Sequence, residues 1–309
     1  MKVATIDVGT NSTRLLIAEL QKDGSVVPIL KTGKVTRLGK GLLKTRRLSE
    51  ESIEATLKAL KEFKSLIEEH GVERVVVATT EAARQAENAA EFLKRVRALG
   101  YEIEILSDRE EAELVFRANL KAFSPEGKAM TVDLGGGSTE VVYGSREGIE
   151  LLKSLKFGVV FLQERFIKSD PPTRGELAAM EEFVRGQLLP IKEKVGESDF
   201  EVFAVGGTIT SVVAMEEKME VYDPEKVHGY KVSYPTVVKW YRLLSSLPVS
   251  ERVNVVGLEK RRSDVIIPGL AFFKVFCELF KKESLTVSEL GLLYGLALKE
   301  AEKWQKERG

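Results

Sequence analysis

The sequence predicts an α/β protein made of two similar domains, each with a mixed β-sheet flanked by helices. Two observations carry this expectation: strand-like and helix-like segments alternate along the chain, and one short motif occurs twice. The motif reads TIDVGTNST at residues 5–13 and TVDLGGGST at residues 131–139, aligned without a gap. Each copy of the motif begins with the residue pattern of a buried strand. Each domain is therefore expected to open with a strand, a turn and a second strand.

Composition narrows the classes of function. The 309 residues include 47 basic and 47 acidic side chains, so the formal net charge is zero. This balance argues against a general nucleic-acid binder, which normally carries a basic footprint. A single cysteine excludes an intrachain disulfide and a Cys-rich metal site, and two histidines exclude a multi-His zinc site. We therefore expect chemistry that depends on side chains other than cysteine and histidine.

No targeting or membrane segment is expected. The N-terminal residues run directly into a strand pattern that contains Asp7, which interrupts the apolar stretch that a signal peptide needs. The longest apolar run, residues 265–273, contains Pro268 and is too short to cross a membrane. These features predict a cytoplasmic protein without membrane contact.

The first domain is expected to span residues 1–123. Its strands are predicted from apolar runs, and its helices from apolar steps of three and four residues, with a Ser49 cap and a stop at Gly71 for the first helix. In order, we expect strands at 3–7, 13–20 and 26–31, a helix at 49–70, a strand at 74–79, a helix at 81–99, a strand at 101–106 and a helix at 109–122.

The second domain is expected to span residues 124–309, after a break at Ser124-Pro125-Glu126-Gly127. Thr173 and Glu176 have the spacing of a capping box and predict the start of a long helix. In order, we expect strands at 129–133 and 139–143, helices at 159–168 and 173–195, a strand at 201–205, a helix after residue 208, a short strand at 285–287 and a last helix at 291–306.

The repeated turn has a definite chemistry. Glycines allow backbone N–H groups to approach an anion, and Ser and Thr hydroxyls add donors, which suits phosphate. An Asp at the strand end repels phosphate and suits Mg²⁺ or a bridging water. Either copy alone is also compatible with an ordinary hairpin. The pair, together with a third turn at Gly206-Gly207-Thr208, favours phosphate binding.

At these residues the chain resembles the Ppx/GppA phosphatase family, in a short two-domain form. The resemblance covers essentially the whole chain, although residues 291–295 lack the Arg that many members carry there and Glu81 departs from the family pattern. The matching segments are DVGTNS at 7–12, RLGKG at 37–41, ATTEAAR at 78–84 with Asn88, ILS through EEA at 105–112, DLGGGSTE at 133–140, GGT at 206–208, PG at 268–269 and residues 288–295.

The resemblance implies two actin-like, ribonuclease H-like domains with an active-site cleft between them, and a last helix, about 291–309, that packs back on the first domain. It implies Mg²⁺-dependent hydrolysis of a terminal phosphoanhydride. The leading hypothesis is an exopolyphosphatase that releases orthophosphate from inorganic polyphosphate. The alternatives are a guanosine pentaphosphate (pppGpp) phosphohydrolase of the stringent response and, in another class, a nucleotide-dependent kinase or ATPase with an adenosine pocket between helices of the second domain.

By the same resemblance, Glu111 is the general base that orients the attacking water. Asp133 and Glu140 are the candidate Mg²⁺ ligands, with Asp7 as their counterpart in the first domain. The candidate phosphate-binding residues are Gly9, Thr10, Asn11, Ser12, Arg84, Gly135, Gly136, Gly137, Ser138, Gly206, Gly207 and Thr208.

A long polyanion also requires basic side chains. The candidates are Arg37, Lys40, Arg261 and Arg262, which lie in two Lys/Arg-rich stretches. Scattered surface cations would give the same pattern. The expected partners are therefore polyphosphate or guanosine pentaphosphate as substrate, with no nucleic acid and no membrane, and the resemblance is compatible with a homodimer.

Overall fold

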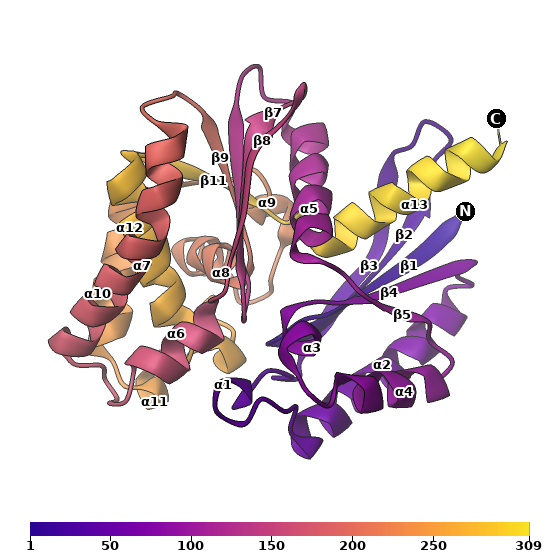
Figure 1. Ribbon diagram of the computed structural model, residues 1–309, viewed down its shortest axis with the longest axis horizontal. Helices are drawn as coiled ribbons and strands as arrows, with labels where there is room; N and C mark the ends of the chain where they lie inside the picture. Colours follow the sequence, from indigo (N-terminus) through magenta and orange to yellow (C-terminus); the bar gives the residue numbers. More distant parts are fainter. Residues whose placement is uncertain (309) are drawn as a thin grey trace. The chain divides into compact units, whose positions relative to one another are not determined.

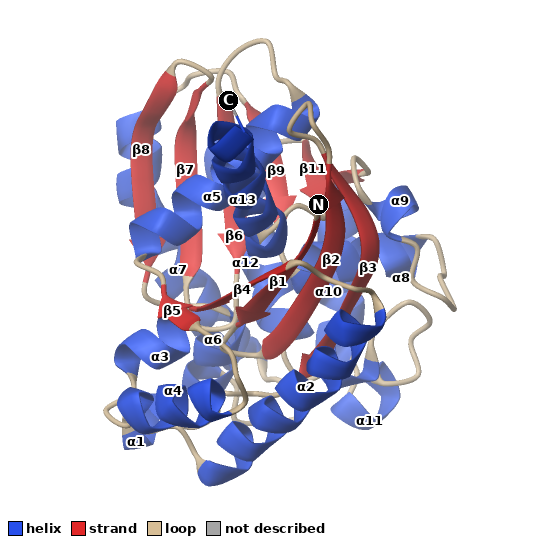
Figure 2. Ribbon diagram, turned by 90° about the vertical axis from the view of Figure 1, so that its right-hand side faces the viewer, coloured by secondary structure: helices blue, strands red, loops and turns tan. Residues whose placement is uncertain are grey.

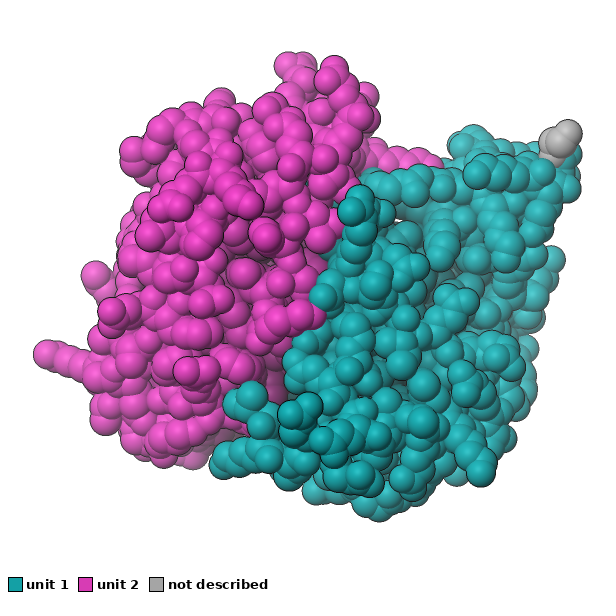
Figure 3. All heavy atoms as spheres, viewed as in Figure 1, with its two compact units in different colours: residues 1–118, 290–309 teal, residues 119–289 magenta. Residues whose placement is uncertain are grey.

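The computed structural model describes residues 1–308, and the chain forms two compact units (Figures 1 and 3). Unit 1 contains Met1–Ala118 and the chain from Leu290 onward, and unit 2 contains Asn119–Glu289. The first crossing between them lies inside helix α5 (Asp108–Phe123), just before the turn where the sequence places the boundary. Unit 1 is therefore built from two separate stretches of the chain.

Unit 1 contains a five-stranded mixed sheet in the order β3-β2-β1-β4-β5. β1 pairs antiparallel with β2 and parallel with β4, and β2 and β3 form a hairpin. The strands are β1 (Lys2–Val8), β2 (Ser12–Leu20), β3 (Val26–Val35), β4 (Arg74–Thr79) and β5 (Ile103–Ile105).

Unit 2 repeats this arrangement. Its six strands have the order β10-β11-β9-β6-β7-β8, in which β6 pairs antiparallel with β7 and parallel with β9. β6 thus takes the place of β1, and the short strand β10 is an addition at the edge. The strands are β6 (Ala129–Leu134), β7 (Thr139–Ser145), β8 (Gly148–Leu155), β9 (Glu201–Val205), β10 (Lys231–Ser233) and β11 (Ser284–Ser288).

The expected fold class is confirmed, because both units consist of a mixed sheet flanked by helices. Unit 1 has α1 (Leu42–Thr45), α2 (Glu50–Glu69), α3 (Glu81–Gln85), α4 (Ala89–Ala98) and α13 (Leu292–Arg308). Unit 2 has α6 (Val159–Phe166), α7 (Arg174–Val195), α8 (Gly207–Glu216), α9 (Pro224–Val227), α10 (Tyr234–Ser246), α11 (Val249–Arg252), a 3₁₀ turn (Lys260–Arg262) and α12 (Ile266–Phe280). None of the helices described is long and apolar enough to span a bilayer.

Strand β1 is buried on both faces because its side chains alternate between two cores. Ala4, Ile6 and Val8 lie in the same core as the buried face of α2, whereas Val3 packs with residues of α13. Thr5, which lies between Ala4 and Ile6 in β1, points to the same side as Val3, and its hydroxyl donates to the carbonyl of Leu293 at 3.0 Å. Helix α13 therefore covers the second face of this sheet (Figure 2).

The single helix predicted at 81–99 is wrong, because α3 and α4 are separate helices. Ala86 has extended backbone angles, and the side-chain amide of Asn88 pairs with the backbone of Leu48. Asn88 Oδ1 accepts from Leu48 N at 2.8 Å and Nδ2 donates to Leu48 O at 3.0 Å. This contact spans 40 residues of sequence and ends the continuous helix.

Candidate active site

The first turn, at the end of β1, is closed by a hydrogen bond from Gly9 N to Ser12 O at 3.0 Å. Thr10, Asn11 and Ser12 are each less than a tenth exposed. The Ser12 hydroxyl is enclosed, and no residue that the structure describes forms a hydrogen bond with it. A buried hydroxyl without a partner in a native protein indicates a site for a ligand or an ordered water.

The segment after β3 holds this turn in place. The amides of Thr36 and Arg37 donate to Asn11 O at 3.1 and 2.9 Å, and the amide of Gly39 donates to Thr10 O at 2.9 Å. A side chain at Gly39 would place Cβ 2.3 Å from the Thr10 methyl group, so glycine is required there. The RLGKG segment thus supports the turn through its backbone.

Two of the predicted basic residues are in this part of unit 1. Arg37 is partly buried and has a left-handed backbone (φ 50°), a conformation that costs energy for a residue other than glycine. Lys40 is exposed. Their role in binding a polyanion stays a prediction.

Asp7 precedes the first turn and pairs in register with Arg14 of β2. Burial raises the pKa of the Asp7 carboxyl to about 6, against the opposing effect of the Arg14 cation. A carboxyl with a raised pKa at the end of a strand is suited to contact a cation, which would offset the cost of its desolvation.

The second turn, in unit 2, closes in the same way, with Gly135 N donating to Ser138 O at 3.1 Å. The start of α6 supports it, because Val159 N donates to Gly135 O at 3.0 Å and Val160 N donates to Gly136 O at 2.9 Å. A Cβ at Gly158 would lie 2.4 Å from Gly135 O. The two copies of the motif therefore fold into the same closed turn.

Asp133 and Glu140 are directly opposite each other in the β6–β7 ladder, so their side chains are on the same face of the sheet. Glu140 is buried, and its Oε1 accepts from Ser154 Oγ at 2.9 Å. Among residues 1–308 no three acidic, His or Cys side chains converge on a common point as ligands for a metal ion. This donor set fits the usual protein contribution to Mg²⁺, which is one or two carboxylates, with the remaining ligands from waters and phosphate oxygens.

The third turn lies next to the second. A side chain at Gly206 would place Cβ 2.5 Å from Leu134 O, and the backbone there is left-handed (φ 111°). Helix α8 starts at Gly207, and the start of a helix presents free N–H groups and a partial positive charge to an anion.

Two further residues pack on the start of α8. Gly269 of α12 lies against the Thr208 hydroxyl, since a Cβ there would be 2.0 Å from Oγ1. The Arg262 guanidinium lies on Gly207, where a Cβ would be 1.8 Å from Nη1, and Arg262 Nε donates to Glu259 at 3.0 Å. Arg262 is thus positioned at the turn, whereas Arg261 is exposed.

Arg84 is surrounded by carboxylates in unit 1. Its Nε and Nη2 donate to Glu81 Oε2 at 3.0 and 2.8 Å, and its Nη1 donates to Leu106 O at 2.6 Å. Glu111 Oε2 is 3.2 Å from Nη1 and Nη2, and Asp108 Oδ1 is 2.7 Å from Nη2. Burial alone would lower the pKa of Arg84, but Glu111, Glu81 and Asp108 raise it.

Glu110 and Glu111, which are neighbours on α5, have different contacts in the structure. Glu110 Oε2 accepts from the amide and hydroxyl of Ser107 at 2.9 and 2.6 Å, and these bonds lower the pKa of Glu110. The Ser107 hydroxyl in turn accepts from the Glu110 amide, which completes a capping box. Glu111 instead contacts Arg84. The Ser107-x-x-Glu110 spacing, which matches a capping box, is a sequence signal that could have separated Glu110 from Glu111.

The sequence allows Glu81 or Glu87 as an ion-pair partner of Arg84 on a surface helix, and the structure selects Glu81, which is only 3% exposed and was not expected to be part of the site. It is one of the residues that depart from the family pattern. The spacing of three residues between Glu81 and Arg84 is the sequence signal for this pair. The contact of Arg84 with Glu111 depends on α3 packing next to α5, and local spacing contains no signal for it.

Comparisons with known proteins identify the family of this chain. The model of the Ppx/GppA phosphatase family matches residues 16–304. The chain is 32% identical to an exopolyphosphatase 2 of Mycobacterium tuberculosis, covering 96% of this chain and 98% of that protein. It is 29% identical to a guanosine-5'-triphosphate,3'-diphosphate pyrophosphatase of Vibrio atlanticus, covering 98% of this chain and 60% of that protein.

A bifunctional 3-dehydroquinate synthase/phosphatase of Fusobacterium nucleatum is also 32% identical over 97% of this chain, and the chain spans 46% of that longer protein. Among solved structures, the Ppx/GppA family member of Aquifex aeolicus superposes with a TM-score of 0.83 at 40% identity, covering 98% of both chains. On the family match and the fold together, this chain belongs to the Ppx/GppA phosphatase family.

Proposed function

We propose that this protein hydrolyses the terminal phosphoanhydride bond of inorganic polyphosphate and releases orthophosphate. The observation that carries the proposal is the repeated turn, which closes with the same Gly N to Ser O hydrogen bond in both units. In unit 1 this turn also contains a buried hydroxyl, that of Ser12, without a partner among the described residues. The family match and the exopolyphosphatase relative support the choice of reaction.

In the proposed reaction, water attacks the terminal phosphorus in line with the bridging oxygen. The new P–O bond forms as the bond to the bridging oxygen breaks, and the shortened chain leaves with the bridging oxygen. Glu111 orients the water and accepts its proton. Arg84 fixes the Glu111 carboxylate through the two contacts at 3.2 Å.

The turn residues of both units bind phosphate oxygens in this proposal. Ser12 and Ser138 contribute hydroxyls, Gly135 to Gly137 contribute backbone amides, and the start of α8 contributes Gly207 and Thr208. Asp133 and Glu140 are the residues that would hold Mg²⁺, and Asp7 has the equivalent position in the first turn. When bound, the ion would neutralise charge on the phosphate oxygens.

The test is orthophosphate release from polyphosphate and from pppGpp, each measured with and without Mg²⁺. Glu111→Gln should lower turnover on the preferred substrate by about 10²- to 10⁴-fold, the usual contribution of a general base. Glu110→Gln is the matched control, because the Glu110 side chain bonds to Ser107 at the start of α5 and has no role in the proposed reaction. Full activity of Glu111→Gln would remove Glu111 as the base, and no release from either substrate would contradict the proposed hydrolysis.

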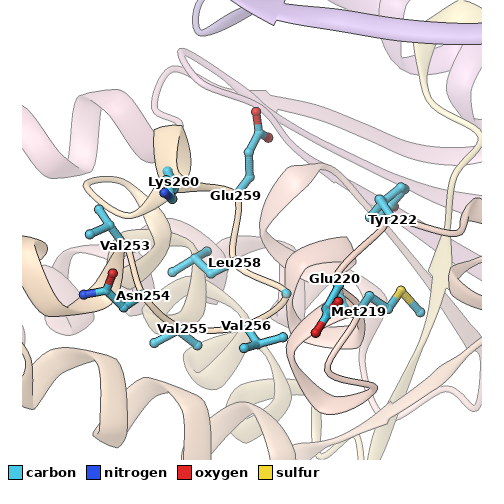
Figure 4. A pocket seen from close by; sticks show the side chains of 12 residues that line it. Met219, Glu220, Tyr222, Val253, Asn254, Val255, Val256, Leu258, Glu259 and Lys260 are labelled. Carbon is cyan, nitrogen blue, oxygen red and sulfur yellow. The ribbon is translucent and has the colours of Figure 1, made fainter.

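A second candidate substrate is pppGpp, which has the same terminal bond. The Vibrio atlanticus relative supports it. Unit 2 also contains a pocket of about 600 Å³ at the far end of α8, a volume in the usual range for small-molecule sites (Figure 4). The third hypothesis, a kinase or ATPase, also requires a nucleoside pocket.

A further inference from the structure

Residues 36–48 connect β3 to the cap of α2 and contain the short helix α1 (Figure 1). At the start of this support segment, three backbone amides donate to the carbonyls of Thr10 and Asn11. The hydroxyls of Thr13 and Thr36 are also 3.0 Å apart, and both are buried. The conformation of the first turn therefore depends on where the support segment lies.

Two residues with left-handed backbones lie near the ends of the support segment, Arg37 (φ 50°) and Arg46 (φ 55°). Neither is a glycine, so each conformation persists only where the surrounding structure holds it. The Ser52 hydroxyl of α2 donates to Arg37 O at 3.0 Å, and the Glu87 amide donates to Arg46 O at 3.0 Å. The support segment is thus held at both ends by residues from elsewhere in the sequence.

Asn88 makes a two-point contact with the last residue of the support segment. Its Oδ1 accepts from Leu48 N and its Nδ2 donates to Leu48 O, so one carboxamide satisfies both backbone groups of this residue. A carboxamide has a donor and an acceptor side by side, whereas an aspartate would place an oxygen against Leu48 O. The Leu48 side chain is buried in the core of unit 1. Asn88 therefore fixes the end of the support segment against this core.

The carboxamide of Asn88 contacts Leu48 and is not one of the groups assigned to the proposed reaction. Arg84 precedes Asn88 by four positions, but Arg84 is anchored separately, to Leu106 O at 2.6 Å. A change at Asn88 should therefore affect the first turn more than it affects the pair of Arg84 and Glu111.

We propose that Asn88 is a positioning residue for phosphate binding by unit 1. Through Leu48 it fixes the support segment, and this segment keeps the turn at residues 9–12 in the closed form that encloses the Ser12 hydroxyl. A turn that is already in its binding conformation reduces the entropy that binding costs. The inference rests on the proposed function for the identity of the ligand, a terminal phosphate, and it adds a residue that acts on affinity from outside the site.

The first experiment separates affinity from turnover. Asn88→Ala removes both hydrogen bonds to Leu48, so KM for polyphosphate should rise about tenfold, whereas kcat should fall less. Tyr101→Phe is the matched control, because the Tyr101 hydroxyl donates to Leu60 O at 3.0 Å across 41 residues of the same unit, outside the support segment. An unchanged KM in Asn88→Ala, or an equal rise in Tyr101→Phe, would overturn the proposal.

A second pair of variants tests the other end of the support segment and stays informative if Asn88→Ala folds poorly. Ser52→Ala removes the hydrogen bond to Arg37 O and leaves Asn88 in place, so KM should rise again. Thr56→Val is the control, because the Thr56 hydroxyl donates to Ser52 O within α2. Equal KM values in these two variants would contradict a role for the support segment.

A third measurement requires no reaction. Hydrogen exchange followed by mass spectrometry reports the amides of residues 36–39, which are protected by their bonds to the turn. These amides should exchange about tenfold faster in Asn88→Ala than in the wild type, and at the wild-type rate in Tyr101→Phe. Equal exchange in all three proteins would overturn the proposal, because Asn88 would then only separate α3 from α4.

Failure of this inference is distinguishable from failure of the proposed function. An active wild type with an unchanged KM in Asn88→Ala would contradict the role of Asn88 alone. A wild type that releases no phosphate from either substrate would contradict the hydrolysis, and the exchange rates of residues 36–39 would still decide whether Asn88 holds the turn.

Discussion

Arg84 directs both of its terminal nitrogens to a single oxygen of Glu111, each at 3.2 Å. The same guanidinium is shared with Glu81 and Asp108, so one cation serves three carboxylates. Glu81 is the most buried of the three, and its Oε2 accepts from two nitrogens of Arg84, Nε at 3.0 Å and Nη2 at 2.8 Å. Glu81 therefore positions Arg84, and through Arg84 it positions Glu111.

The first prediction concerns this arrangement. Glu81→Gln keeps the size of the side chain but removes the charge that holds Arg84, so turnover should fall by about tenfold, less than in Glu111→Gln. The rate of orthophosphate release at a saturating concentration of polyphosphate measures this turnover. Glu91→Gln, on the exposed side of α4, is the control. If Glu81→Gln matched the wild type in turnover, Glu81 would have only a structural role.

The second prediction concerns acid stability. Glu176 accepts from Ser169, from Thr173 N at 2.7 Å and from Lys168 N at 2.7 Å. The Ser169 hydroxyl, followed by the backbone at Thr173, lowers the pKa of Glu176 to about 2 from its ordinary 4.5. Because the folded pKa is the lower one, this stabilisation is complete above pH 4.5 and is lost as the pH falls towards 2.

Glu176→Gln should therefore unfold more easily than the wild type at neutral pH, by about 1 kcal/mol as for other helix caps. The difference should shrink as the pH is lowered towards 2. Urea unfolding at several pH values measures it, with Glu182→Gln on the same helix as the control. A difference that stayed constant with pH would contradict the assigned contacts.

The third prediction compares two glycines. Gly158→Ala would place Cβ 2.4 Å from Gly135 O, so the turn at residues 135–138 must move and both activity and melting temperature should fall. Gly186→Ala lies inside α7 with nothing within 4 Å of the new Cβ. It should stabilise the protein by about 0.5–1 kcal/mol because the unfolded chain loses freedom. Thermal melts and phosphate release distinguish the two, and equal effects would argue against the close approach at Gly158.

The fourth prediction concerns a charged network on the helical side of unit 2. Lys274 of α12 donates to Glu181 of α7 at 2.7 Å and pairs with Glu278 at 3.0 Å. Lys274→Met should cost about 1–3 kcal/mol, since both half-buried carboxylates lose a partner. The free energy of unfolding in urea measures it, and Lys303→Met on α13, where the lysine is exposed, is the control. Equal losses in the two variants would mean that the network adds nothing.

The conformation of the two repeated turns could be predicted from the sequence because their hydrogen bonds are local. Gly9 and Gly135 each bond to a serine three residues later, so a window of nine residues contains the whole signal. The strands around the turns follow from apolar runs of similar length. Cap signals also worked: Ser49 and Thr173 start α2 and α7 as their spacing indicates.

Features that depend on distant contacts could not be predicted. The break between α3 and α4 comes from Asn88 binding Leu48, and nothing near Asn88 in the sequence indicates that partner. The pocket beside α8 is formed by residues near 220 and a loop near 256, which approach each other only after α8 and Arg252 are in place. The edge strand β10 was not predicted because its three residues, Lys231–Ser233, contain a single apolar side chain.

The two crossings of the chain between the units determine the order in which the protein is completed on the ribosome. Unit 2 is a continuous stretch and can fold as soon as Glu289 has emerged. Unit 1 starts first but stays open until α13 arrives to cover Val3 and Leu16. Unit 1 is therefore completed after unit 2, although its first strands are made earlier, and its apolar sheet face stays exposed to chaperones and proteases until α13 is made.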